Sequence, residues 1–349
     1  MEKKKARNGK VDLMKFLFSL VVIIYHFGNA VDYEHEIFNK GYMAVEFFFI
    51  VSGFLFAKSL SRVKYEKETL ASDSAAFMLR KYKSFMPYHI FMVAVTFAYL
   101  FIHNGWNIGE LAVNVANSLP DILLLQMGLV KQQSLLGHEW YISAMLIVMF
   151  VLTPIVIKYR ESFTKIAAPA VSLLVLGYLC RRFDGSLNLV FDDTGFFYAG
   201  VLRALAELSL GCLCYEICKS GVLEKMNRYF LMAAEAAIYI LLLVYANKGL
   251  EEISPYVVVI LLAVAVTLSF SDTTSVSFLN NKAVSFLGKI SFPIYLMQIV
   301  MRQIIAKIDW QYGYASHVLL YVVSVIAASL VCMLVMDNVL KLFNKPKSK

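Results

Sequence analysis

Two residues in the first apolar segment have types and a spacing that suit proton transfer. Lys15 and His26 are eleven residues apart, close to three turns of an α-helix, so they share one face about 16 Å apart. An imidazole accepts and returns a proton near neutral pH because its unperturbed pKa is about 6.5. The spacing predicts a cation at one end of a helix and a base toward the other. The alternative is a histidine that only anchors a helix end.

A carboxylate interrupts the next apolar segment, which reads GYMAVEFFFIVSGF. The chain enters this segment on the side where it leaves the first one, so Glu46 and His26 could meet. A carboxylate beside an imidazole orients its tautomer and stabilises its protonated form, as in a hydrolase triad. The alternative is an interfacial glutamate exposed to water. Ser52 and Gly53 suit close helix packing better than chemistry.

Charged and aromatic residues at two further places suit ligand binding. Arg80 and Lys83 stand three residues apart, so on a helix they project from one side and could grip a phosphate or pyrophosphate. Their alternative role is to set membrane topology. Trp140 and Tyr141 begin a later apolar segment, where they could stack on a sugar ring or serve as ordinary interfacial anchors.

The remaining polar residues of the apolar segments are interpreted as structural. Arg203 and Glu207 have the i, i+4 spacing of an ion pair within one helix. The cysteines lack the spacing of metal ligands, so we expect packing roles for them and no metal site. The five cysteines are Cys180, Cys212, Cys214, Cys218 and Cys332.

These residues must be positioned by helices that cross a membrane. The chain of 349 residues is 59% hydrophobic and only 17% charged, and its mean hydropathy is +0.65, outside the range of soluble domains. The sequence predicts an all-α integral membrane protein with about ten transmembrane helices. The predicted spans are 11–29, 41–60, 85–103, 139–157, 166–181, 197–217, 229–247, 255–271, 291–308 and 316–340.

Other readings of the N-terminus and of the charge are less consistent with the sequence. A cleaved signal peptide would need a small-residue cleavage site after Tyr25, and none follows. If both termini are cytoplasmic, most of the 33 Lys and Arg residues fall on that side, as the positive-inside rule requires. The net charge of +8 is then explained by topology and anionic lipid, without a nucleic-acid partner. No repeat or linker divides the chain, so residues 1–349 form one predicted domain.

Five motifs, taken in order, resemble the acyltransferase-3 family of integral membrane acyltransferases. They are VDLMKFL with YHFG, GYMAVEFFFIVSGFLF, RKYKSFMPY, HEWYISAML at 138–146 and KISFPIYLMQ at 289–298. The resemblance implies that the protein acylates hydroxyl groups of extracytoplasmic glycans, using acyl-coenzyme A. It also implies a multi-pass protein of a cell membrane, expected to be a bacterial cytoplasmic membrane.

The resemblance also assigns roles to some of the residues above. The family's first helix carries a basic residue before an essential histidine, which matches Lys15 and His26, and its paired arginines match Arg80 and Lys83. Where this chain has lysine, the charge is kept but the planar guanidinium fork is lost. The family often ends its late motif with histidine, whereas this chain has Gln298, which cannot shuttle a proton.

The reaction implied by the resemblance is acyl transfer across the membrane. The expected donor is acetyl-coenzyme A or another acyl-coenzyme A, held at the cytoplasmic face by Lys15, Arg80 and Lys83, and the expected acceptor is a carbohydrate outside. His26 is the expected general base, and Glu46 orients it or binds the acceptor. A covalent acyl-histidine intermediate is an open alternative, and so is a different function, transport of a glycan precursor.

Overall fold

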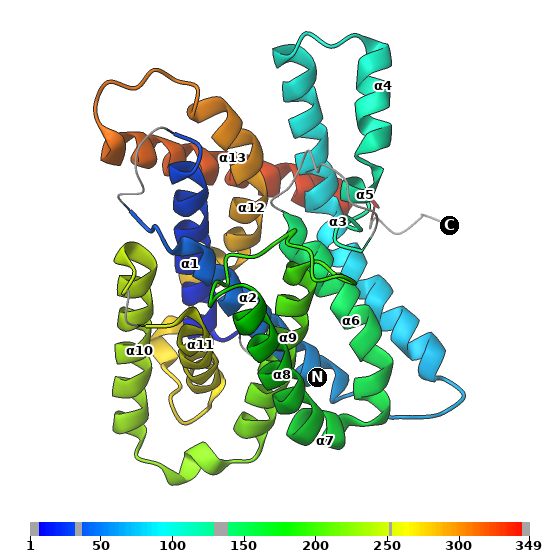
Figure 1. Cartoon of the computed structure of the whole chain (residues 1–349), viewed down its shortest axis with the longest axis vertical. Coiled ribbons are helices and arrows are strands. Elements are labelled where there is room, and N and C mark those ends of the chain that lie inside the picture. Colours follow the sequence, from blue (N-terminus) through cyan, green and yellow to red (C-terminus); the bar gives the residue numbers. More distant parts are fainter. Residues whose placement is uncertain (1–6, 32–36, 129–138, 251–252, 344–349) are drawn as a thin grey trace.

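The computed structural model describes residues 7–31, 37–128, 139–250 and 253–343, which fold into a bundle of helices without a named strand (Figure 1). The predicted all-α membrane fold is confirmed. The helical elements are α1 (Gly9–Gly28), η1 (Gly41–Met43), α2 (Ala44–Leu60), α3 (Leu70–His103), α4 (Ile108–Asn117), α5 (Leu119–Ile122), α6 (Trp140–Lys158), α7 (Arg160–Ser162), η3 (Phe163–Ala167), α8 (Ala168–Arg182), α9 (Ala199–Lys219), η4 (Val222–Lys225), α10 (Arg228–Lys248), α11 (Pro255–Phe270), η5 (Ser277–Leu279), α12 (Lys282–Ile305) and α13 (Tyr314–Phe343).

Eight helical stretches in the described residues are long and apolar enough to cross a membrane. They correspond to eight of the ten predicted spans. The other two predicted spans fall on α9, which carries four charged residues, and on α11, which is only 16 residues long. The count of ten and the cytoplasmic location of both termini therefore stay predictions.

Three elements depart from the predicted spans. Helix α12 begins at Lys282, nine residues before the predicted start at 291. Helix α3 begins at Leu70, well before the predicted start at residue 85, because its first turns carry charged residues that a hydropathy pattern does not mark as a span. Beyond α3 the chain forms α4, which no apolar run predicted and which has no buried residue. The end of α3 and α4 stand side by side and project from the top of the view (Figure 1).

Close backbone contact joins α2 to α9 in the interior of the bundle. A Cβ atom built on Gly53 would lie 2.1 Å from the carbonyl oxygen of Leu208, and one on Gly211 would lie 2.1 Å from that of Ile50. Only glycine permits this approach. The predicted packing role of Gly53 is thus supported by the contact. Elsewhere on α2, the fully buried rings of Phe47 and Phe49 pack against Phe18 of α1 and Trp140 of α6.

Candidate functional site

A cavity of about 910 Å³ lies where the start of α1, the ends of α2 and α9, and the connection from α11 to α12 meet. Its lining contains more cations than anions. The basic lining residues are Arg7, Lys10, Lys15, Lys58, Arg62 and Lys219, and the acidic ones are Asp12, Glu224 and Asp272. We call this the basic cavity. By the predicted topology, all the helix ends that form it are cytoplasmic.

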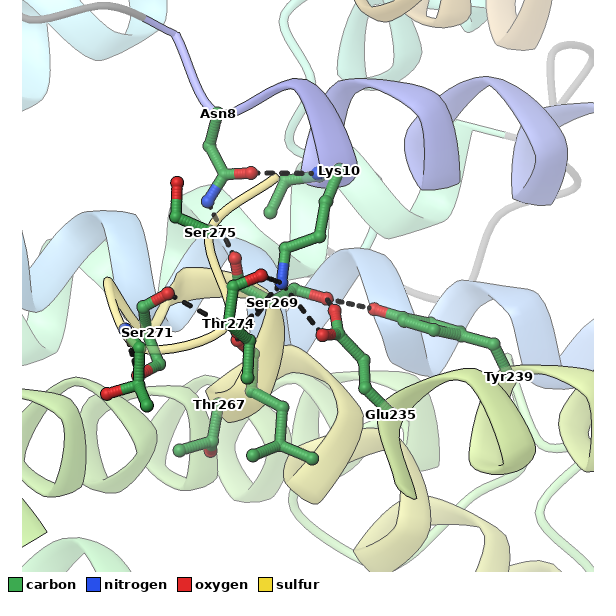
Figure 2. Close-up of polar contacts among 12 residues, drawn as sticks. Asn8, Lys10, Glu235, Tyr239, Thr267, Ser269, Ser271, Thr274 and Ser275 are labelled. Atoms are coloured by element: carbon green, nitrogen blue, oxygen red, sulfur yellow. Dashed lines mark hydrogen bonds and ion pairs between the residues drawn. The ribbon is translucent and has the colours of Figure 1, made fainter. Parts of the chain in front are cut away.

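Two of the basic lining residues already have carboxylate partners. The guanidinium of Arg7 donates two hydrogen bonds of 2.7 Å to Asp12. Lys10 reaches from α1 to Glu235 of α10, at 2.7 Å, and to the hydroxyl and carbonyl of Thr274, at 2.8 and 2.9 Å (Figure 2). These two cations therefore build the wall of the basic cavity and contribute little free charge to it.

The ion pair between Lys10 and Glu235 belongs to a larger polar network in the same wall. Ser269 donates to the second oxygen of Glu235 at 2.7 Å and lies 2.8 Å from the hydroxyl of Tyr239 (Figure 2). The Asn8 amide donates to the carbonyl of Ser269 at 2.7 Å. The network joins the start of α1 to α10 and to the end of α11, so it fixes the shape of the cavity.

The other cations give the basic cavity its net charge. Lys15, Arg62 and Lys219 form no ion pair with any described residue. Two aromatic rings lie beside them, Phe54 nearly buried and Phe270 half-buried. The rings of Phe54 and Phe270 stack at 3.8 Å, and the ammonium of Lys58 lies 5.9 Å from each ring.

Aromatic rings with unneutralised cations suit a ligand that has both a planar ring and phosphates. This combination is the physical basis for regarding the basic cavity as the candidate ligand site.

The predicted phosphate-binding pair of α3 lies apart from this cavity. Arg80 and Lys83 are both exposed. Arg80 lines a separate, smaller cavity of about 210 Å³, together with Lys81, and Lys83 lines neither of the two. Lys81 is the residue of this turn that lies within electrostatic range of Lys15. The structure therefore places one of the three predicted phosphate ligands, Lys15, in the basic cavity.

The predicted base lies at the other end of α1. His26 is half-buried in the last turn, its ring centroid is 5.4 Å from that of Tyr25, and Arg302 of α12 lies within electrostatic range. Lys15 and His26 thus occupy the same helix, as predicted.

Glu46 forms a buried ion pair with Arg203 of α9. The same guanidinium donates to the carbonyl of Leu189 at 2.5 Å and lies 5.1 Å from the ring of Trp140. The predicted ion pair between Arg203 and Glu207 is wrong, because the side chain of Arg203 crosses to α2. The carboxyl of Glu207 lies next to that of Glu46 instead.

The two predicted sugar-binding aromatics are largely enclosed. Trp140 is 6% exposed, with the Arg203 guanidinium over its ring and Gly200 against its edge. Tyr141 is half-buried, and its hydroxyl lies 3.0 Å from that of Ser52. Tyr141 is therefore the more exposed of the two side chains.

Residues 8–337 match the family model described as the acyltransferase domain of acyltransferase-3, which is nearly the whole chain. The chain belongs to the acyltransferase-3 family. No curated protein and no solved structure matches it significantly. Membership of the acyltransferase-3 family makes this protein a membrane acyltransferase, which favours the enzyme over the transporter of a glycan precursor.

This acyltransferase-3 chain also contains a buried pair that sequence reasoning missed. His89 of α3 and Glu139 are both fully buried, with Nδ1 of the imidazole 2.7 Å from the carboxylate and Nε2 3.0 Å from the carbonyl of Ile122. The pair ties α3 and α5 to the start of α6. The signal was an ionisable residue inside a predicted span. His138, which precedes Glu139, lies outside the described residues.

The described part of this acyltransferase-3 chain contains no cluster of metal-ligand side chains. No three His, Cys, Asp or Glu side chains gather there as a metal site requires. The cysteines of α9 donate to backbone carbonyls: Cys212 to Gly53, Cys214 to Ala263 and Cys218 to Thr267. These bonds are consistent with the predicted packing role.

Proposed function

We propose that this protein transfers an acyl group, with acetyl as the default, from acyl-coenzyme A to a hydroxyl of an extracytoplasmic glycan. The observation that carries the proposal is the arrangement along α1. Lys15 lines a cavity with excess positive charge, and His26 stands at the opposite end of the same helix. One helix thus links a site for phosphates to a candidate base.

The basic cavity is the proposed donor site. Coenzyme A carries an adenine ring, a diphosphate and a 3′-phosphate, which suit the half-buried ring of Phe270 and the cations Lys15, Arg62 and Lys219. The volume lies within the range of about 300–1,000 Å³ typical of small-molecule sites. The long pantetheine arm would carry the thioester away from these phosphates, toward His26.

The exposed basic residues of α3 would act earlier in donor binding. Arg80 and Lys83 lie outside the basic cavity, so we assign them to the attraction of the anionic donor to the cytoplasmic face. Lys81, which interacts electrostatically with Lys15 but also lies outside the basic cavity, is assigned the same role.

The chemical step uses His26 as general base. The imidazole takes the proton of the acceptor hydroxyl, and the hydroxyl oxygen forms a bond to the acyl carbon. The carbon–sulfur bond breaks, and the leaving thiolate takes up a proton to give free coenzyme A. Arg302, which lies within electrostatic range of His26, would stabilise the negative charge that develops on the acyl oxygen. An acyl-histidine intermediate is the alternative to direct transfer.

The acceptor is proposed to bind at the His26 end of the bundle. Tyr141 is the candidate aromatic contact for a sugar ring. Trp140 supports this region through its contact with Arg203, which in turn holds Glu46. Glu46 would therefore act on the acceptor side without being the direct partner of the imidazole.

The test is the ester-linked acetyl content of cell-surface glycans in a deletion strain. The strain is complemented with the native protein, with His26→Ala, or with His103→Ala, which changes an exposed histidine at the end of α3. Membrane abundance is measured for each. We expect the native protein and His103→Ala to restore the ester and His26→Ala to fail at equal abundance. Restoration by His26→Ala would remove His26 from the mechanism.

A further inference from the structure

The contact between α2 and α9 contains more buried carboxyl groups than cations. Glu46 and Glu207 are 0% exposed, and Arg203 is 1% exposed. Arg203 is the cation that acts on this pair of carboxyls within the described residues. If both carboxyl groups were ionised, the cluster would carry a net negative charge inside the membrane bundle.

The hydrogen bonds show which carboxyl is compensated. Arg203 donates to one oxygen of Glu46 and to the carbonyl of Leu189. No donor among the described residues reaches the second oxygen of Glu46 or either oxygen of Glu207. Glu207 stands one helical turn from Arg203 on α9, and Arg203 bonds Glu46, so both carboxyl groups are neighbours of the same guanidinium. Glu207 is thus a fully buried carboxyl that receives no hydrogen bond from any described residue and has another acid beside it.

Within the described ranges, the neighbouring helices bring no second cation to this cluster. On α6, the hydroxyl of Tyr141 is engaged by Ser52. On α11, the hydroxyl of Tyr256 donates to the carbonyl of Ser186. On α8, the hydroxyl of Ser172 donates to Ala206. Among the described residues, the other titratable groups that interact electrostatically with the carboxyl pair are the neutral hydroxyls of Tyr42, Tyr141 and Tyr256.

An uncompensated carboxylate in such a place costs several kcal/mol, and two adjacent carboxyls avoid that cost by sharing one proton. We propose that Glu46 and Glu207 form a carboxylate–carboxylic acid pair that binds one proton, so that the α2–α9 contact is a proton-binding site inside the membrane. The proton resides on Glu207 and is donated to the unpaired oxygen of Glu46. The site goes beyond the proposed acyl transfer and does not depend on it.

Infrared spectroscopy of the purified full-length protein tests the site directly. A protonated carboxyl absorbs at higher frequency than amide I, and this band shifts in deuterated water. We expect the native protein to show such a band at neutral pH, Glu207→Gln to lose it, and Glu216→Gln to keep it. Glu216 is the matched control because it lies on the same helix, within reach of Lys165. A native spectrum without a band assignable to Glu207 would overturn the proposal.

Thermal stability gives a second, independent measurement. Gln is close in shape to a protonated Glu, so Glu207→Gln should retain the melting temperature at neutral pH, whereas Glu46→Gln should lower it by leaving Arg203 unpaired. Because the folded state would hold a proton that the unfolded chain releases, native stability should fall as pH rises from neutral. Glu207→Gln should lack this slope. A loss for Glu207→Gln equal to that for Glu46→Gln at neutral pH would show a Glu207 carboxylate stabilised by Arg203, and a clear gain would show an ionised, uncompensated Glu207. Either result would refute the proton site.

A metal cation is the competing occupant of the same carboxyl pair. Sodium and potassium chloride are therefore compared with a chloride salt of a bulky organic cation at equal ionic strength. We expect no difference in the melting temperature of the native protein among these salts. Stabilisation by sodium or potassium that disappears in Glu207→Gln would overturn the proton assignment in favour of a cation.

Discussion

At the scale of single residues, the cations of the basic cavity are of two kinds, those with a carboxylate partner and those without. Arg7 and Lys10 are held by Asp12 and Glu235, so their charges are largely compensated. Arg62 and Lys219 form no ion pair with described residues. The two kinds of cation should therefore respond differently to mutation, one through stability and the other through ligand affinity.

We expect Arg62→Gln and Lys219→Gln to weaken binding of acetyl-coenzyme A to the purified protein, by roughly two- to fivefold each, because exposed charge pairs contribute modestly. The melting temperature should not change. Lys225→Gln is the control, since Lys225 is an exposed basic residue nearby that does not line the cavity. An equal loss of affinity in the control would show a general surface effect and argue against the cavity as the donor site.

The Lys10–Glu235 pair should behave as a buried ion pair. We expect Glu235→Leu to cost about 3 kcal/mol in the free energy of unfolding, because Lys10 is left buried without its partner. The double change Lys10→Met with Glu235→Leu should recover part of that loss. Unfolding in detergent measures both, and the exposed pair Glu161–Lys165 provides the control, where the same changes should have little effect. Strictly additive losses at Lys10 and Glu235 would contradict the coupling.

The sequence permitted some of these residue assignments and not others. Lys15 and His26 could be placed on one helix because helical spacing is a local property. The partner of Arg203 could not be predicted, since Glu46 lies 157 residues away and only the packing of α2 on α9 brings them together. The same holds for His89 and Glu139, which are separated by 50 residues.

At the scale of helices, the α2–α9 contact depends on two glycines. We expect Gly53→Ala to destabilise the protein by about 1–3 kcal/mol, as overpacking does, because the new Cβ would meet the Leu208 carbonyl at 2.1 Å. Gly177→Ala on α8 is the control, since a Cβ there has no neighbour within 4 Å. Its stability should be unchanged or slightly higher, because alanine favours helix. Equal melting temperatures for the two variants would contradict this account.

Helix positions were predicted well where apolar residues are continuous and poorly elsewhere. The segments 41–60 and 139–157 agree closely with the helices observed. The prediction failed for the start of α3, because Asp73, Arg80 and their neighbours are polar yet helical. It also failed for α4, whose capping box at Asn107 and Glu110 is a start signal for a helix that lies outside any apolar run.

At the scale of the whole molecule, the basic cavity and His26 lie at opposite ends of the bundle. Because α9 ends at the basic cavity, we expect α9 to cross the membrane, with its two flanking loops on opposite sides. In a variant without its five cysteines, we expect Lys225→Cys to react with a membrane-impermeant maleimide only in inside-out vesicles. Phe196→Cys, at a residue that is 96% exposed, should react only in right-side-out vesicles. Labelling of both positions from one side would show that α9 does not cross and would remove the predicted topology.

The ion pair between Arg203 and Glu46 has a consequence for how the protein is made. Helix α9 carries Arg203, Glu207, Glu216 and Lys219, so it is a poor candidate for spontaneous partition into lipid when it leaves the translocon. Helix α2 is synthesised much earlier and holds the carboxylate that compensates Arg203. We therefore expect biogenesis to follow an order in which α2 stays near the insertion site and receives α9, so that the charges enter the bilayer already paired.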